Sequence, residues 1–283
     1  MKKYLLVALT GLLLFSSCAK EFNQVYKSSD YHYRYEYAKE CFAAGKYQRA
    51  VTLLQQLIIQ AKGTPEAQES LYMLGMAEYG DRDYATAAET FKRYVKSYPR
   101  GVYAEEAEYY VGQSLYMCTP EPRLDQTETV AAIAAYQEYL DLYPDAKYKE
   151  QAQRSLFALQ DKLVEKELKS AQLYYDLGSY FGNTSTTSDG LANGNNYQAC
   201  IVTSQNALKD YPYSKHREDF AVLIMKSKFE LAEQSVEAKK IQRYQDAEDE
   251  CYGFINEYPD SKERKRAEEY IEKCKKVTEN VKE

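Results

Sequence analysis

One spacing recurs along this chain and limits it to a repetitive helical fold. A Tyr-Pro pair ends each of four copies and begins fourteen residues after the first member, in the pairs Tyr84 to Tyr98-Pro99, Thr129 to Tyr143-Pro144, Tyr197 to Tyr211-Pro212 and Tyr244 to Tyr258-Pro259. Three residues after each first member stands a small side chain, namely Ala87, Ala132, Cys200 or Ala247. A small residue on one face lets a helix approach its neighbour closely, and proline cannot continue the helix. Each copy therefore predicts a packed helix that stops at its Tyr-Pro pair.

The pattern resembles the tetratricopeptide repeat, a helical hairpin of about 34 residues. The second copy shows it best, with Leu74-Gly75, Asp83-Tyr84, Ala87, Phe91 and Pro99. An earlier copy with Tyr47, Ala50 and Leu54 lacks the Tyr-Pro pair, and successive copies begin 37, 45, 68 and 47 residues apart. We therefore predict an all-α solenoid of about five hairpins, irregular and interrupted by insertions.

The repeat register divides the chain into segments. We predict a signal peptide at 1–17, a lipidated linker at 18–29, repeats 1 and 2 at 30–100, repeat 3 with a long helix at 101–180, a flexible polar insertion at 181–196, and repeats 4 and 5 with a charged C-terminal helix at 197–283. The alternating stretch Tyr31–Tyr37 is interpreted as the start of the first helix, and Thr119–Glu128 as a loop inside repeat 3. Each insertion is either a partner contact or a tolerated surface loop.

The N-terminal residues predict that the protein is secreted and anchored to a membrane. Two lysines precede an apolar run from Tyr4 to Phe15, and Ser16-Ser17-Cys18 follows, which is typical of a secretory signal. The segment resembles a bacterial lipobox, although Phe15 stands where an aliphatic residue is usual. Acylation of Cys18 would anchor the chain to a membrane without crossing it. The alternative is an ordinary secretory signal with an incidental cysteine.

The residues after Cys18 indicate which membrane carries the anchor. No Asp follows the cysteine, which favours the outer membrane by resemblance to well-studied lipoproteins. In some lipoproteins a run of acidic residues directly after the cysteine resembles a signal for export to the cell surface. Here the corresponding residues contain a single acid, Glu21. We therefore expect the protein to face the periplasm.

Charge and reactive residues favour a binding protein over an enzyme. The net charge of -6 argues against nucleic acid as the main partner, because phosphate contacts need clustered Lys and Arg. Cys41, Cys200 and Cys251 fall on core positions of the repeat. With Cys118 and Cys274, five cysteines follow Cys18, so at least one thiol stays free or pairs between chains. The sequence shows no metal-ligand spacing or nucleophile motif, so we expect no metal, no cofactor and no catalytic residue.

The first helix of a tetratricopeptide hairpin lines a groove, and its register predicts a peptide-binding site. The candidates are Tyr35, Lys39 and Phe42 in repeat 1, Tyr72, Met76 and Tyr79 in repeat 2, and Tyr109, Gln113 and Tyr116 in repeat 3. Aromatic side chains give a large contact area with an extended or helical peptide at small entropic cost. The alternative is that these residues pack one repeat on the next.

A longer stretch resembles one family in particular. Leu124-Asp125-Gln126-Thr127, Tyr143-Pro144 with Tyr148, and a long helix ending in Leu173-Tyr174-Tyr175 resemble the BamD family of outer-membrane assembly lipoproteins. Ala146 replaces a serine of the family pattern, and the polar insertion and charged C-terminus depart from it. The resemblance implies a non-enzymatic subunit of the machine that folds β-barrel proteins. It also implies a BamA-like barrel subunit bound through residues 197–275, and unfolded outer-membrane proteins bound at the N-terminal groove.

Two other functions remain open from the sequence. One is a periplasmic repeat adaptor for another envelope process, which would bind different partners. The other is a glycan-binding lipoprotein of nutrient uptake. Glycan-binding proteins of that class resemble much longer chains, and they stack sugars on tryptophan. This chain has no tryptophan.

Overall fold

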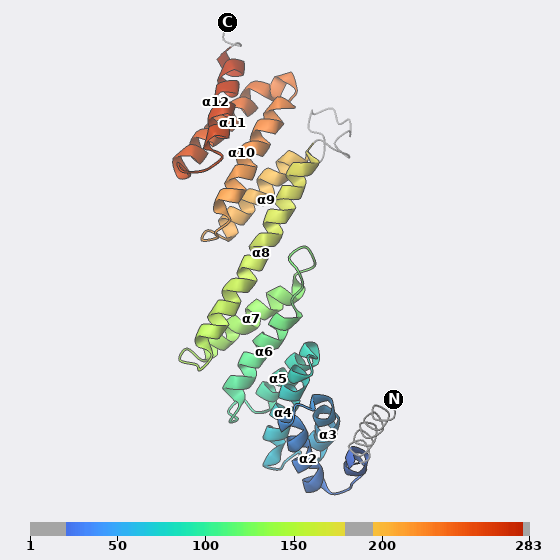
Figure 1. Cartoon of the computed structure of the whole chain (residues 1–283). Coiled ribbons are helices and arrows are strands. Elements are labelled where there is room, and N and C mark those ends of the chain that lie inside the picture. Colours follow the sequence, from blue (N-terminus) through green and yellow to red (C-terminus); the bar gives the residue numbers. More distant parts are fainter. Residues whose placement is uncertain (1–20, 179–194, 280–283) are drawn as a thin grey trace, which may run out of the picture. The chain divides into compact units, whose positions relative to one another are not determined.

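The computed structural model describes residues 21–178 and 195–279, and the regular elements within them are α-helices (Figure 1). The chain forms two compact units. The first comprises the described residues up to Pro120 together with Asp125–Leu159, and the second comprises Glu121–Leu124 and the described residues from Gln160 onward. The predictions for the signal peptide, for Cys18 and for insertion residues 181–194 lie outside the described residues.

The first unit is a series of helical hairpins. Its helices are α2 (Tyr31–Ala43), α3 (Tyr47–Gln60), α4 (Glu66–Gly80), α5 (Tyr84–Ser97), α6 (Ala104–Cys118) and α7 (Thr127–Leu142), followed by the first part of α8 (Lys149–Leu177). From α2 to α7, each helix packs on the next one along the chain. The start of α2 at Tyr31 confirms the interpretation of the alternating tyrosine stretch as helix.

The second unit continues the same architecture. It contains the remainder of α8, then α9 (Asn196–Asp210), α10 (Arg217–Glu233), α11 (Glu237–Glu257) and α12 (Arg264–Glu279). Helix α10 packs on both α9 and α11, and α11 packs on α12. The all-α fold built from helical hairpins is therefore confirmed in both units.

The Tyr-Pro pairs end their helices as predicted, and all four do so in the same way. Helices α5, α7, α9 and α11 stop directly before Tyr98, Tyr143, Tyr211 and Tyr258. These four tyrosines share φ between -134° and -126° and ψ between 62° and 72°. The following proline disfavours helical geometry at the residue before it, so one local rule sets four chain reversals.

The helix starts follow the register less strictly. Helices α3 and α5 begin at the first member of their repeats, and Asp83 caps α5 by accepting a hydrogen bond from the Thr86 amide at 3.3 Å. Helix α11 begins at Glu237, seven residues before Tyr244. The residues between the two are good helix formers that neither Gly nor Pro interrupts, so the helix extends beyond the repeat.

Close packing explains the glycines and small residues of the repeat. Ala87, Ala132, Cys200 and Ala247 are completely buried. A Cβ placed on Gly75 would lie 2.8 Å from the Phe91 ring, and one on Gly112 would lie 2.8 Å from the Tyr136 ring. Only glycine fits at these two contacts, because a core aromatic ring of the following helix touches the backbone.

The turns between hairpins are closed by different bonds in the two units. In the first unit, the buried hydroxyls of Tyr94 and Tyr139 each accept a hydrogen bond at 3.2 Å, from the amides of Tyr103 and Tyr148. The corresponding positions of the second unit are Ala207 and Phe254, which have no hydroxyl.

In the second unit an arginine closes each turn instead. Arg217 donates to the Pro212 carbonyl at 3.2 Å, and Arg264 donates to the Pro259 carbonyl at 3.1 Å. The serine hydroxyls of these turns, on Ser214 and Ser261, accept hydrogen bonds from amides two residues later. The first unit thus uses its core to hold the turn, and the second uses the surface.

The cysteines after Cys18 are unpaired thiols, and four of them lie in the core. Cys41, Cys200, Cys251 and Cys274 are buried, whereas Cys118 is partly exposed. The prediction of core packing is confirmed for Cys41, Cys200 and Cys251. No helix among the described residues has the length and apolar character that a membrane crossing requires.

Candidate functional site

The structure places the predicted groove residues on α2, α4 and α6. Tyr35 is only 4% exposed. Lys39 remains accessible, and its ammonium nitrogen lies 3.7 Å from the Glu69 carboxylate of α4. Phe42 packs edge-on against Tyr47, with ring centroids 5.9 Å apart. Among the repeat 1 candidates, Tyr35 therefore offers little surface to a ligand, whereas Lys39 is accessible.

The candidates in repeat 2 form aromatic contacts with the next repeat. Tyr72 stacks on Tyr103 with centroids 4.3 Å apart and planes 6° from parallel. Tyr79 meets the edge of Tyr110 at 5.3 Å. Met76 packs in the same apolar cluster. All of these side chains are partly buried, so they hold the repeats together and still present surface.

Repeat 3 extends the same contacts. Tyr109 is 8% exposed and stacks on Tyr148 at 4.4 Å. Gln113 accepts hydrogen bonds from the hydroxyls of Tyr109 at 3.2 Å and of Tyr136 at 2.8 Å. Tyr116 is partly buried against the same core. The side-chain carbonyl oxygen of Gln113 thus orients two rings of the core.

These contacts define a surface that we call the tyrosine cluster, made of Tyr72, Tyr79, Tyr103, Tyr110 and Tyr148. Sequence reasoning found the first two members and missed the last three. A signal for two of them was present, since Tyr103 and Tyr148 each stand five residues after the tyrosine of a Tyr-Pro pair. The packing interpretation fits the buried Tyr35 and Tyr109, while peptide binding stays a prediction for the partly buried members.

Glu106 lies beside three members of the tyrosine cluster, Tyr72, Tyr110 and Tyr148. Its carboxylate accepts a hydrogen bond from the Tyr148 hydroxyl at 2.6 Å and lies 3.9 Å from the Lys147 ammonium. Burial, reinforced by the neighbouring Tyr148 and Glu106, raises the pKa of Tyr110 to about 12. The pKa of Tyr72 is raised as well, first by burial and then by Glu106. These phenols therefore stay protonated at neutral pH.

A protonated tyrosine offers a ring face and a hydroxyl that donates or accepts hydrogen bonds. The cluster therefore has the chemistry of a surface that binds a polypeptide through aromatic contact and polar anchoring. The described residues hold no group of three or more His, Cys, Asp or Glu side chains arranged for a metal ion.

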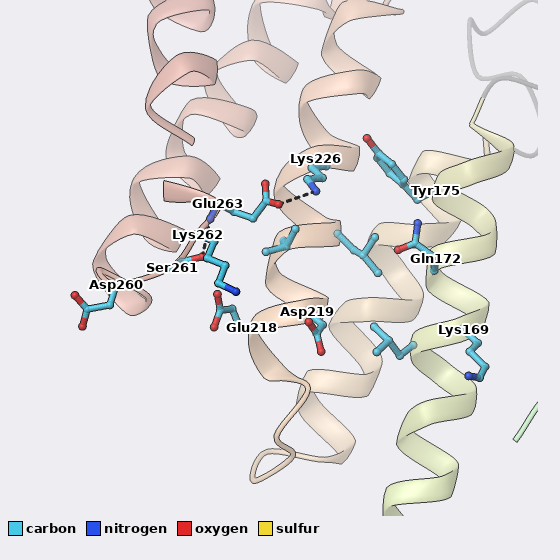
Figure 2. Close-up of a pocket in the computed structure, with 13 residues that line it drawn as sticks. Lys169, Gln172, Tyr175, Glu218, Asp219, Lys226, Asp260, Ser261, Lys262 and Glu263 are labelled. Atoms are coloured by element: carbon cyan, nitrogen blue, oxygen red, sulfur yellow. Dashed lines mark hydrogen bonds and ion pairs between the residues drawn. The ribbon is translucent and has the colours of Figure 1, made fainter. Parts of the chain in front are cut away.

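The second unit contains a cleft of about 730 Å³ between α8, α10 and the turn before α12 (Figure 2). Its apolar lining is Leu168, Val222 and Leu223, and its charged lining has both signs. Figure 2 shows Lys226 of α10 directed toward Glu263, with 3.4 Å between the ammonium nitrogen and the carboxylate oxygen. Sequence reasoning assigned this region to a partner without naming its side chains.

Comparison with known proteins gives one family match. The profile of the YfiO family, described as outer membrane lipoprotein, matches residues 28–189. That range contains the tyrosine cluster and all of the predicted groove residues.

Two curated proteins are similar in sequence. The outer membrane protein assembly factor BamD of Caulobacter vibrioides is 24% identical over 160 residues, which is 56% of this chain and 52% of that protein. The putative outer membrane protein assembly factor BamD of Aquifex aeolicus is 31% identical over 131 residues, 44% of this chain and 41% of that protein. The chain thus spans about half the length of the curated relatives it matches.

Solved structures with tetratricopeptide repeats also align with the chain. The TPR2AB domain of yeast Sti1, in a complex with pHSP90, aligns with 84% of this chain and 95% of its own, at 14% identity and a TM-score of 0.37. The TPR-like repeats of a putative kinesin light chain from Podospora anserina align with 88% and 94%, at 16% identity and a TM-score of 0.32.

Proposed function

Because this chain belongs to the YfiO family of outer membrane lipoproteins, we propose that it is a non-enzymatic scaffold of the complex that assembles β-barrel proteins in the outer membrane. The observation that carries the proposal is the family match over residues 28–189. Both curated relatives bear the name of an outer membrane protein assembly factor, which supports the same function. Acyl chains on Cys18 anchor the protein to the membrane, and the repeats face the periplasm.

The N-terminal unit is the proposed binding site for unfolded barrel substrates. The tyrosine cluster supplies ring faces and neutral hydroxyls, and Lys39 adds one accessible cation at the end nearer the N-terminus. An extended chain that alternates apolar and polar residues and carries aromatic residues near its ends, as a strand of a barrel does, matches this combination.

The C-terminal unit is the proposed binding site for a BamA-like barrel subunit. The cleft between α8 and α10 combines an apolar floor with charges of both signs, which suits the polar and apolar mixture of a folded protein surface. Within residues 197–275, α10 and the turn before α12 contribute most of the cleft.

Co-purification tests the assembly function directly. The native lipoprotein would be isolated from gently solubilised membranes and its partners identified by mass spectrometry. We expect stoichiometric recovery of a barrel protein with periplasmic domains. Recovery of other envelope proteins would favour the repeat-adaptor alternative, and direct glycan binding would favour the nutrient-uptake alternative.

Peptide binding tests the proposed role of the tyrosine cluster. The double variant Tyr72→Ala, Tyr79→Ala should weaken binding of a fluorescent peptide taken from a barrel strand. Because both rings also pack on the next repeat, the variant should lose stability too. Leu57→Ala is the matched control, since it removes a fully buried side chain of α3 outside the cluster. Equal peptide affinity in the two folded variants would contradict the role.

A further inference from the structure

The first unit has two furrows between alternate helices. The first furrow lies between α3 and α5. The second furrow lies between α5 and α7, has α6 as its floor, and shares no lining residue with the tyrosine cluster. It encloses about 440 Å³. Its apolar lining consists of Val95, Val111, Leu115, Ala131, Ala134 and Ala135. The polar residues of the lining are Lys92, Lys96, Glu108 and Glu138. Small alanines on α7 leave room for a long side chain from another molecule.

Glu108 is a buried carboxyl group that faces this furrow without a partner. Its residue is 6% exposed, and the part of the chain that the structure describes supplies it with neither a hydrogen bond nor an ion pair. Lys92 of the same lining is bound instead to Glu89 at 2.8 Å. Burial and the charge of Glu138 raise the pKa of Glu108 to about 7. A buried carboxyl group with a second carboxyl group beside it favours a cation at this position.

The first furrow, between α3 and α5, contains a buried carboxyl group with a guanidinium in the same lining. Glu78 of α4 is 3% exposed and lines that furrow together with Thr90 and Arg93 of α5. Burial raises the pKa of Glu78, and a hydrogen bond from Thr90 and the charge of Arg93 oppose this effect only in part. Its Oε2 atom is buried without a hydrogen-bond partner. The chain therefore places its own guanidinium near the acid in the first furrow.

The repeat register places different residues at the same two positions of the second furrow. Counted from Tyr84 in one repeat and Thr129 in the next, Glu138 corresponds to Arg93, and Ala135 corresponds to Thr90. The exchange of arginine for glutamate and of threonine for alanine removes the cation and the hydroxyl while keeping the apolar walls. The second furrow therefore has a carboxyl group where the first has a guanidinium, and its own cations, Lys92 and Lys96, stand on the opposite wall formed by α5.

We propose that the furrow between α5 and α7 is a docking site for a partner polypeptide that inserts an arginine side chain toward Glu108 and Glu138. The planar guanidinium can bond to both carboxylates, and its aliphatic stem fits along Val95, Leu115 and the alanines of α7. The site uses the face formed by α5 and α7, and it does not depend on whether the tyrosine cluster binds barrel substrates.

Site-specific photocrosslinking in cells tests the proposal with the full-length lipoprotein. A p-benzoylphenylalanine at Ala134, an exposed residue of the lining, should form an adduct with a partner peptide that carries an arginine within a few residues of the crosslink. The double variant Glu108→Gln, Glu138→Gln should reduce the adduct at least about tenfold. Glu150→Gln, an exposed acid of α8 in the same unit, is the matched control and should leave the yield unchanged.

A charge exchange distinguishes arginine docking from nonspecific binding. Glu138→Arg places a guanidinium at the position that Arg93 holds in the first furrow, so the chain should then provide its own cation and exclude the partner. Replacing the partner's arginine with alanine should abolish the adduct in the parent protein. The proposal is overturned if no adduct forms at Ala134, if the captured peptide contains no cation near the crosslink, or if the adduct persists in folded Glu138→Arg protein.

Discussion

Replacement of Glu108 by glutamine should stabilise the first unit at alkaline pH and leave it unchanged at acid pH. Burial and Glu138 raise the pKa of this carboxyl group from 4.5 to about 7. The folded chain therefore holds a proton between these values that the unfolded chain has released. Stability consequently falls as the pH rises through this window, and the loss is complete above the folded pKa.

The magnitude follows from the same two values. A pKa change from 4.5 to about 7 corresponds to about 3.4 kcal/mol of unfolding free energy above pH 8. The furrow is open to water and Glu138 is exposed, so we reduce this to about 2 kcal/mol. The charged groups facing Glu108 are Lys92 and Lys96 from α5 and Glu138 from α7.

Urea unfolding at pH 4.5 and pH 8 measures the effect. The chain has no tryptophan, so Tyr98→Trp, introduced into parent and variant alike, provides a fluorescence signal from the first unit. Glu108→Gln should raise the unfolding free energy by about 2 kcal/mol at pH 8 and by less than about 0.5 kcal/mol at pH 4.5. An equal effect at both pH values, or a destabilised variant at pH 8, would refute the reasoning; Glu150→Gln is the control for an exposed acid.

Three further predictions follow from packing, turn closure and thiol burial. Gly75→Ala should destabilise the protein by about 1–3 kcal/mol, because the new Cβ would lie 2.8 Å from a buried ring. Gly253→Ala, with no atom within 4 Å of the new Cβ, should instead stabilise α11 by up to about 1 kcal/mol. Urea unfolding measures both changes in unfolding free energy. Tyr94→Phe should cost about 1 kcal/mol in the same assay, because the amide in the following turn loses its acceptor, and an unchanged midpoint would contradict this. Among the cysteines after Cys18, Cys118 should be the first that a maleimide labels in the folded protein, and Cys118→Ser should delay labelling until urea unfolds the chain; mass spectrometry locates the adduct.

Local rules made the fold predictable, and long-range contacts limited prediction of the sites. The Tyr-Pro pairs fixed four helix ends because a proline acts on the residue directly before it. The extension of α11 back to Glu237 escaped prediction, since the repeat register carries no information about helix formers that precede it.

The partners of the aromatic residues could not be assigned in the same way. Tyr72 was identified as a face residue, but its stack on Tyr103 joins separate hairpins across 31 positions. Whether such a ring is covered or available depends on the angle between neighbouring hairpins, which no local spacing encodes. The burial of Glu108 could not be predicted either. A glutamate in a helix is usually exposed, and its burial here depends on how the neighbouring helices pack around it.

The two methods of turn closure have a consequence for how the array can change. Where Tyr94 and Tyr139 reach from the core to the next helix, an altered core residue also moves the entry of the following hairpin. Arg217 and Arg264 instead close their turns from the surface, and Arg217 also donates to Glu257 at the end of α11 at 3.0 Å. We therefore expect a substitution at Tyr94 or Tyr139 to shift the start of the next helix, and a substitution at Arg217 or Arg264 to loosen the turn while leaving the core packing intact.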